Sequence, residues 1–527
     1  MNWRNKPPVR VQTQSYKQLA FYAFFGTTFA FIMLYYFSNT VIHYTTDQQF
    51  PINSLTRYPL SIPILLAEIF SFAFASYFLY NLFTDQYRPP TPKPLSIKPP
   101  VAILIPVYNE PKDIVERTLQ AANEVKWPEK TIYLLDDSTD EQAKTNMRAL
   151  AKKHNAKHVT RPDNKGYKAG NINHAVKDAI KEEFFVILDS DQAPHPELLS
   201  RTMNHFSNQE VFFVQTPQYY INDDTPLRRA AKVGTNIFYQ AQCVSKARDK
   251  AMPFCGTNVI VRTQHFKELK GFSYYTSTED IDLGLRANDR GWHGVYVPEV
   301  LVRGYAPPNW RAYETQQYRW ANGNLAILTK NYKELAWGKF SLLHQTHTLF
   351  TIGWWFIGLV TLAYIFVPLI SLATNLPTHH LWLSNALIGL LYVNALIGIM
   401  LLFVALRGRT QDDKVTLFDA FLQYSLIVNS MFIYTKAAIN ALLRRYTGFV
   451  TTNKNESQES YKDIKYNLLL AATCFVASGY ALYLTTIAVT EEQLRTYLPI
   501  SLWLLFYAVI LTSSILFIHK TPAEATA

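Results

Sequence analysis

Six long stretches that are almost free of charge set the first limit on what this 527-residue chain can fold into. Five contain no Asp, Glu, Lys or Arg, and the other contains only Glu68. In chain order the stretches are 19–42, 59–83, 349–374, 382–406, 467–489 and 498–518. At a rise of about 1.5 Å per residue, each is long enough to cross a hydrocarbon core of about 30 Å. We therefore expect a multi-pass membrane protein with about six spans.

The distribution of basic residues predicts which side of the membrane each connector faces. The chain has 51 Lys and Arg against 40 Asp and Glu, a net charge of +11. Retention of Lys and Arg on the cytoplasmic side explains this balance without a nucleic-acid partner. The connectors 43–58, 375–381 and 490–497 hold few basic residues, whereas 85–345 holds many. We expect the large central region and both termini to be cytoplasmic, in a plasma or inner membrane.

A Pro-rich linker at 87–100 precedes a region in which strand and helix patterns alternate. Apolar runs typical of buried strands occur at 101–108, 131–137, 184–191 and 211–217. Helical patterns lie near 112–125, 140–154 and 166–180. Alternating strands and helices predict a parallel sheet with helices on both faces. Ligands of such sheets bind beyond the carboxyl ends of the strands.

These patterns divide the chain into three regions. An N-terminal membrane region with two spans covers 1–86, and a cytoplasmic α/β domain that ends in interface helices covers 87–335. A C-terminal membrane region with about four spans covers 336–527. Within it, 417–443 contains Asp419 and Lys436, so we interpret it as an interfacial or buried amphipathic helix rather than a span.

Paired acids follow two of the predicted strands. Asp136 and Asp137 end one strand, and Asp189 and Asp191 end another. An Asp at a strand end is often a turn former or a helix cap, which is the alternative for each pair. The Asp-x-Asp spacing also lets two carboxylates converge on one hard cation. Mg²⁺ or Mn²⁺ bound in this way takes substrate phosphate oxygens as further ligands.

Two later segments carry further candidates for chemistry. In "TEDIDLGLR" (278–286), helix capping explains Thr278 and one acid, while a carboxylate there could also act as a general base. In "QQYRW" (316–320), polar and aromatic side chains lie on one helical face. The alternative for this segment is an interfacial helix with Trp at the headgroup level.

Taken together and in order, these motifs closely resemble processive family-2 glycosyltransferases of the cellulose synthase superfamily. The matching elements are "IPVYNEP", "LLDDSTD", "GYKAGN", "LDSDQAP", "VQTPQYY", "FCGTN", "STEDIDLGLR" and "QQYRW". The resemblance implies a GT-A (Rossmann-like) α/β domain inserted in a helical membrane bundle. It also implies inverting transfer from a nucleotide sugar to the non-reducing end of a growing polysaccharide.

The resemblance implies a role for each matched residue. The nucleotide sugar would be bound by Tyr108, Glu110, Asp136, Asp137, Lys168, Asp189 and Gln316, with Mg²⁺ or Mn²⁺ held by Asp189 and Asp191. The catalytic group would comprise Asp280 as general base, with Glu279, Asp191 and Arg319. Trp320 and Cys255 would contact the acceptor.

The polar stretch "FVTTNK" between membrane segments also fits the resemblance. A gating loop of pattern Phe-x-Val-Thr-x-Lys is matched within 446–460 by Phe449, Thr452 and Lys454, with Thr451 in place of the Val. The resemblance implies a lid that closes over the diphosphate, and the alternative is a solvated connector.

The donor expected first is UDP-glucose, giving a β-glucan of β-1,4, β-1,3 or mixed linkage that is exported through the protein's own channel. "DDSTD" and "GYKAG" resemble plant glucomannan synthases, while "VQTPQYY" and "GNIN" resemble cellulose synthases. GDP-mannose for a mannan, UDP-N-acetylglucosamine for a chitin- or hyaluronan-like polymer, and a non-processive lipid glycosyltransferase are therefore alternatives. We expect no PilZ-type domain in this polypeptide. Accessory export subunits or a homo-oligomer are further possible partners.

Overall fold

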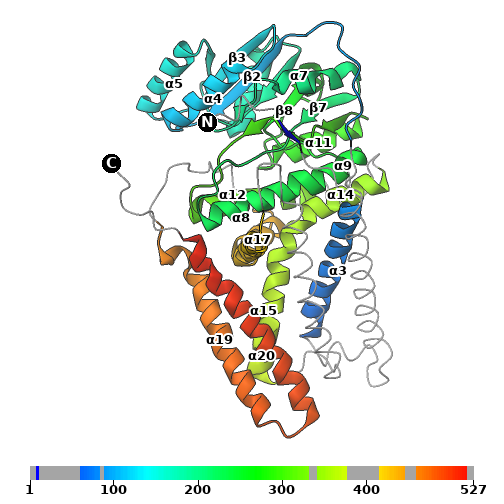
Figure 1. Ribbon diagram of the computed structural model, residues 1–527, viewed down its shortest axis with the longest axis vertical. Coiled ribbons are helices and arrows are strands. Elements are labelled where there is room, and N and C mark those ends of the chain that lie inside the picture. The colour runs from blue at the N-terminus through cyan, green and yellow to red at the C-terminus, as the bar shows by residue number, and fades with distance from the viewer. Residues whose placement is uncertain are drawn as a thin grey trace.

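The computed structural model describes residues 8–10, 60–83, 88–330, 341–376, 415–445 and 459–518. The predicted spans 19–42 and 382–406 and the loop residues Phe449, Thr451, Thr452 and Lys454 lie outside these ranges. Figure 1 shows an α/β domain at one end, a layer of crosswise helices beneath it, and long helices that extend away from that layer.

A seven-stranded sheet forms the centre of the α/β domain, with strand order β4-β3-β2-β5-β8-β7-β9. Its strands are β2 (Val101–Val107), β3 (Lys130–Asp136), β4 (Lys157–Thr160), β5 (Phe184–Ile187), β7 (Val211–Gln215), β8 (Val259–Arg262) and β9 (His293–Tyr296). β8 runs antiparallel to both β5 and β7, whereas the other pairs are parallel. The predicted all-parallel sheet is therefore wrong, and the sheet is mixed. The strands missed from the sequence (β4, β8 and β9) have four residues each, too few for a clear periodic pattern.

Helices cover both faces of the sheet because successive side chains of a strand point to opposite sides. Val101, Ile103 and Ile105 of β2 belong to one core, with side chains of α4 (Lys112–Glu124) and α5 (Glu141–Lys153). Ala102 and Leu104 belong to the other core, with α6 (Tyr167–Asp178) and α11 (Glu279–Asp289). The helices expected near 112–125, 140–154 and 166–180 are thus present.

Short elements complete this domain. Two small antiparallel pairs join β1 (Val9–Arg10) to β10 (Glu299–Val300) and β6 (Ala193–Pro194) to β11 (Val302–Arg303). The short helical segments are α7 (Leu198–Thr202), η2 (Met203–Ser207) and α10 (Thr263–Glu268). A longer helical run consists of α8 (Pro226–Ile237), the π-helical η3 (Phe238–Gln242) and α9 (Cys243–Arg248).

The crosswise layer consists of α8, α12 (Trp310–Lys330) and α14 (Leu342–Gly353), as Figure 1 shows. It is tied to α3 (Ser61–Phe83) by a buried chain of hydrogen bonds. Tyr77 Oη of α3 lies 2.8 Å from His347 Nδ1 of α14. His347 Nε2 lies 2.8 Å from Asp249 Oδ2, next to α9. This chain holds the first described membrane-region helix against the α/β domain.

Within the described residues, three helices are long and apolar enough to span a membrane: Leu342–Thr374, Tyr461–Thr486 and Thr496–Phe517. They coincide with the predicted spans 349–374, 467–489 and 498–518. Their component elements are α14, η4 (Trp354–Phe356) and α15 (Ile357–Thr374), then η5 (Tyr461–Ile464) and α19 (Lys465–Thr486), then α20 (Glu491–Thr512) and η6 (Ser513–Phe517). The predicted span 59–83 contains α3, a helix of 23 residues, within which Ile62–Phe78 is an apolar helix shorter than a full span.

The segment 417–443 is two helices, α17 (Leu417–Asn429) and α18 (Met431–Leu442), bent by 42° at the break. Ser430 lies at the break, and its hydroxyl donates to the Leu426 carbonyl at 2.7 Å, a contact that commonly accompanies helix bending. α18 packs along α12, where Tyr434 Oη donates to Gln317 Oε1 at 3.1 Å. The single helix expected from the sequence is therefore a broken pair, and much of it is buried.

Candidate active site

The loop after β5, which we call the acid loop (Asp189, Ser190 and Asp191), lies at the carboxyl edge of the sheet. Lys168 Nζ of α6 donates to Asp189 Oδ1 at 2.5 Å and to the Gly256 carbonyl at 2.9 Å. The backbone N–H of Tyr305 donates to Asp191 Oδ2 at 3.3 Å. Lys168 therefore links the acid loop, which follows β5, to the "FCGTN" segment, which leads into the neighbouring strand β8.

The acid loop also determines how a metal ion could be held. The described residues contain no group of three or more His, Cys, Asp or Glu arranged to hold a metal ion. The side chain of Asp189 is 32% exposed, so it can reach a ligand. Two carboxylates from one turn are the donor set that Mg²⁺ or Mn²⁺ uses when substrate phosphates complete its coordination. The residues present therefore fit a metal ion that arrives with a diphosphate.

The second acid pair is already engaged with basic side chains. Asp136 Oδ2 lies 2.9 Å from His158 Nε2, and Arg161 donates to both carboxylate oxygens of Asp137 at 2.8 and 2.6 Å. Burial alone raises the pKa of Asp136, but the hydrogen bonds from His158 and Ser138 outweigh it and leave the pKa below its ordinary value. Both acids are buried, so they shape the edge of the site as a rigid, paired unit.

Tyr108 and Glu110 follow β2 at the same edge. The ring of Tyr108 is exposed, and its backbone N–H donates to Glu110 Oε2. Glu110 Oε1 accepts from Ser190 Oγ at 3.2 Å. Of the two expected nucleotide-sugar residues after β2, Glu110 contacts the acid loop directly, and Tyr108 contacts Glu110.

Glu279 and Asp280 begin α11 beside Gly256. Gly256 has a φ of +69°, and a Cβ there would lie 2.8 Å from Asp280 Oδ2, so only glycine allows this approach. Burial raises the pKa of Glu279 to about 7, and the neighbouring Asp280 charge adds to the shift. Burial likewise raises the pKa of Asp280 to about 6, against hydrogen bonding and the charges of Lys168 and Arg319. Desolvated carboxylates with pKa values near neutrality are suited to proton transfer.

The capping interpretation of this segment is wrong for Thr278. Thr278 occupies the N-cap position of α11, but its side chain accepts no capping hydrogen bond. Its hydroxyl instead lies 3.2 Å from that of Thr276. Asp280 Oδ1 accepts from the adjacent Ile281 N–H at 2.9 Å.

α12 brings the "QQYRW" side chains onto this acid pair. A Cβ on Gly323 would lie 2.6 Å from Ser277 Oγ and 2.8 Å from the Thr278 nitrogen. The backbones of α12 and 276–278 therefore pack so closely that no side chain fits between them at Gly323. Ser277 Oγ donates to the Arg319 carbonyl at 3.0 Å. Burial lowers the pKa of Arg319, while its carboxylate neighbours, led by Glu279, raise it. Arg319 therefore lies among the carboxylates of both the acid loop and α11.

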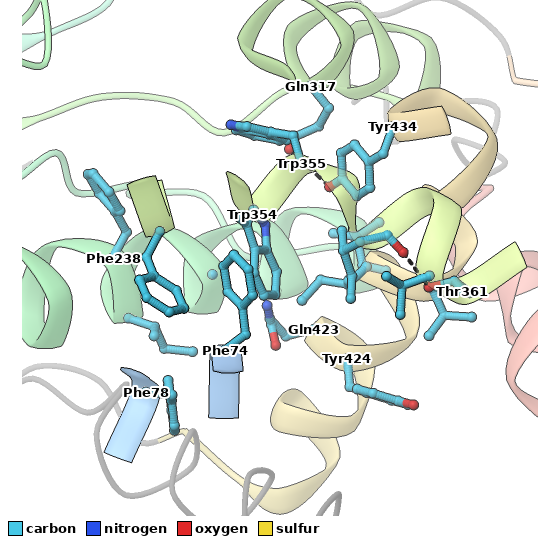
Figure 2. Close-up of a pocket in the computed structure, with 18 of the residues that line it drawn as sticks. Phe74, Phe78, Phe238, Gln317, Trp354, Trp355, Thr361, Gln423, Tyr424 and Tyr434 are labelled. Carbon is cyan, nitrogen blue, oxygen red and sulfur yellow. Dashed lines mark hydrogen bonds between the residues drawn. The ribbon is translucent and has the colours of Figure 1, made fainter. Parts of the chain in front are cut away.

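Gln316, Trp320 and Cys255 line a cavity of about 670 Å³ together with Asp280. The same cavity extends between the membrane-region helices, where its walls are largely aromatic. Figure 2 shows this part, with side chains from α3, η3, α15 and α17 around one space. Its lining includes Phe74, Tyr77, Phe238, Phe350, Trp354, Trp355, Tyr364, Tyr424, Trp503 and Tyr507.

Two polar residues in the membrane region illustrate different roles. Asn429 donates to the Ile510 carbonyl at 3.1 Å and to Ser425, and Asn467 donates to Asn429, so its contacts hold helices together. Tyr364 lines the cavity, and its hydroxyl lies 2.9 Å from Ser71 Oγ. The sequence analysis did not single out Trp354 and Trp355, although two adjacent Trp residues near the start of a predicted span could have indicated an aromatic wall.

Comparisons with known proteins match the part of the chain that carries these residues. Residues 99–323 match the family described as "Glycosyltransferase like family 2". The cellulose synthase 1 catalytic subunit [UDP-forming] of Komagataeibacter xylinus is 32% identical over 283 residues, which are 51% of this chain and 37% of that protein. The probable glucomannan 4-beta-mannosyltransferase 7 of Oryza sativa subsp. japonica is 33% identical over 266 residues, 48% of this chain and 45% of that protein. The matches thus span less than half the length of these two relatives.

Among solved structures, a mannosyltransferase from Pyrobaculum calidifontis in complex with GDP-Man and Mn2+ aligns with a TM-score of 0.53. It is 18% identical and covers 73% of this chain and 99% of its own. At this identity the likeness concerns the fold alone, which is a GT-A-like mixed α/β sheet.

Proposed function

Because residues 99–323 form a family 2 glycosyltransferase domain, we propose that the chain is a membrane-embedded, processive, inverting polysaccharide synthase. One observation carries the proposal: the cavity that holds Asp280 and Trp320 continues between the membrane-region helices to Tyr364 and Trp503. An enzyme that releases a soluble product on the side of its catalytic domain needs no such path. A polymer that leaves through the membrane requires it.

In the proposed reaction, Asp280 accepts the proton of the acceptor hydroxyl as that oxygen attacks the anomeric carbon. The bond between the anomeric carbon and the diphosphate breaks, and Arg319 offsets the charge that develops on the leaving group. Burial and the Asp280 charge raise the pKa of Glu279 above that of Asp280, so Glu279 would hold its proton while Asp280 is ionised. Lys168 holds Asp189 and the Gly256 carbonyl in one arrangement. A Mg²⁺ or Mn²⁺ ion held with the diphosphate by Asp189 and Asp191 would neutralise further negative charge.

The remaining site residues would bind the two substrates. Tyr108, Glu110 and the Asp136–Asp137 pair would surround the nucleoside. Trp320 offers a flat aromatic surface to the apolar face of a sugar ring, with Gln316 and Cys255 beside it. The loop residues Phe449, Thr451, Thr452 and Lys454 would close over the diphosphate. This arrangement includes a cytoplasmic catalytic domain and about six spans.

The identity of the donor sugar is a separate part of the proposal. We propose UDP-glucose as donor and a β-glucan as product, and GDP-mannose with a mannan product is the second candidate. Relatives named for each sugar have nearly equal identity to this chain, which keeps both in consideration.

A panel of radiolabelled UDP-glucose, GDP-mannose and UDP-N-acetylglucosamine, given to purified protein with Mn²⁺, tests the proposal. High-molecular-weight product from one donor supports it, and a linkage-specific glycanase then identifies the linkage. Asp280→Asn should lower transfer by about 100-fold or more while nucleotide binding remains. Product that is only lipid-soluble would contradict processivity, and an active Asp280→Asn variant would contradict the base assignment.

A further inference from the structure

Two adjacent residues of α4, Arg117 and Thr118, donate hydrogen bonds to backbone carbonyls of the acid loop. Thr118 Oγ1 donates to the Ser190 carbonyl at 2.8 Å, and Arg117 Nη2 donates to the Asp191 carbonyl at 2.6 Å. Thr118 is fully buried. Each hydrogen bond goes to a backbone carbonyl of the loop and not to a carboxylate, so it fixes the backbone.

Arg117 makes a second contact that leads back to the same aspartate. Its guanidinium carbon lies 4.0 Å from the centroid of the Tyr305 ring, a close cation–π stack. The backbone N–H of Tyr305 donates to Asp191 Oδ2. Asp191, Arg117 and Tyr305 therefore form a closed ring of contacts in which the backbone and the side chain of Asp191 are both fixed.

The contacts among Arg117, Tyr305 and Asp191 are also connected to α12, which carries the proposed acceptor-binding residues. Gly304, just before Tyr305, forms a β-bridge with Tyr220, and the chain enters α12 at Trp310. Gln316 of α12 and Tyr220 line the same cavity. Arg117 thus connects the acid loop to the segment that leads into α12.

We propose that Arg117 is a positioning residue of the proposed reaction, which orients the Asp191 carboxylate toward a divalent cation bound with a nucleoside diphosphate. The inference rests on the proposed function. A planar guanidinium can donate to a carbonyl while it stacks on a ring, whereas a lysine ammonium does this poorly. Residues that orient metal ligands typically change metal affinity by about 10–100-fold when altered.

The test measures Mn²⁺ affinity, by the electron paramagnetic resonance signal of free Mn²⁺, for the full chain in detergent with UDP or GDP. Arg117→Lys should weaken Mn²⁺ binding in the presence of the nucleotide by about 10-fold. Tyr305→Leu, which removes the ring, should weaken it similarly. Tyr305→Phe should bind as the wild type does, because the hydroxyl takes part in neither contact. The matched control is Arg148→Lys, at an exposed position of α5, and it should also bind as the wild type does.

The outcomes separate this inference from the proposed function. Thermal unfolding of each variant shows whether it is folded, and Tyr305→Leu serves if Arg117→Lys does not fold. Wild-type Mn²⁺ affinity in folded Arg117→Lys and Tyr305→Leu would overturn the role of Arg117 alone. A wild-type chain that binds no Mn²⁺ with either nucleotide would overturn the proposed function, and this inference with it.

Discussion

At the scale of single residues, the buried acids Glu279 and Asp280 determine how activity depends on pH. Burial raises the pKa of Asp280 to about 6 and that of Glu279 to about 7. A general base must be deprotonated, so kcat/KM should fall by about tenfold per pH unit below the pKa and level off above it. Initial rates between about pH 5 and 9 check this. A profile that rises as the pH falls would contradict the assignment.

Glu279→Gln gives a sharper version of the same prediction. Burial, together with the Asp280 charge, raises the pKa of Glu279 above that of Asp280, so Glu279 still holds its proton while Asp280 ionises. Glu279→Gln mimics that protonated form, so the acid limb of the profile should stay where it is in the wild type. Asp289→Asn, at the exposed end of α11, should also leave the limb where it is. A limb that moves to lower pH in Glu279→Gln would show that Glu279 ionises before Asp280.

The sequence motifs predicted the residues proposed to contact the substrates. They did not predict Arg117, which hydrogen-bonds a backbone carbonyl of the acid loop. Lys168, Asp189, Asp280 and Arg319 lie in one region because each ends a strand or faces one side of a helix. Arg117 gave no signal, since a contact to a backbone carbonyl leaves no trace in residue spacing. The roles of the matched residues stay predictions, as does that of the loop around Lys454.

At the scale of elements, the contact between α12 and 276–278 controls how Arg319 and Asp280 face each other. In Gly323→Ala the new Cβ would lie 2.6 Å from Ser277 Oγ, so α12 must move away. A displacement near 1 Å can cost about 100-fold in rate, and we expect kcat to fall by about 10–100-fold. Steady-state kinetics on protein in detergent measures it.

Gly479→Ala is the matched control for Gly323→Ala. Gly479 lies in α19, and a Cβ there would meet nothing within 4 Å. Alanine favours a helix by about 1 kcal/mol over glycine, so this variant should keep its kcat and unfold at the same or a higher temperature. An equal loss of kcat in both variants would mean that the effect does not come from the α12 contact.

Element prediction succeeded for the longer patterns and, among the four-residue strands of the central sheet, only for β5, whose apolar run continues to Leu188. The strands β2, β3, β5 and β7 and the helices α4, α5 and α6 were all expected. The antiparallel β8 was missed because "VIVR" is short and strand direction depends on tertiary connections. The break at Ser430 depends on a local hydroxyl contact that hydrophobicity does not report.

At the scale of the whole molecule, a polymer path can be obstructed without touching the reacting groups. Thr361 of α15 lines the cavity, as Figure 2 shows, and Thr361→Trp would add an indole to it. We expect shorter product and less of it, while hydrolysis of the nucleotide sugar continues. Gel filtration of labelled product measures length. Phe475→Trp, on the exposed face of α19, should have little effect.

The central claim is that one chain both makes the polymer and passes it across the membrane. Inside-out membrane vesicles containing the protein are supplied externally with the labelled donor and Mn²⁺, and then with a glycanase that degrades the product in detergent. We expect the polymer to resist the glycanase until detergent opens the vesicles. Polymer that is degraded in intact vesicles would contradict it, because synthesis would then release product on the side of the catalytic domain.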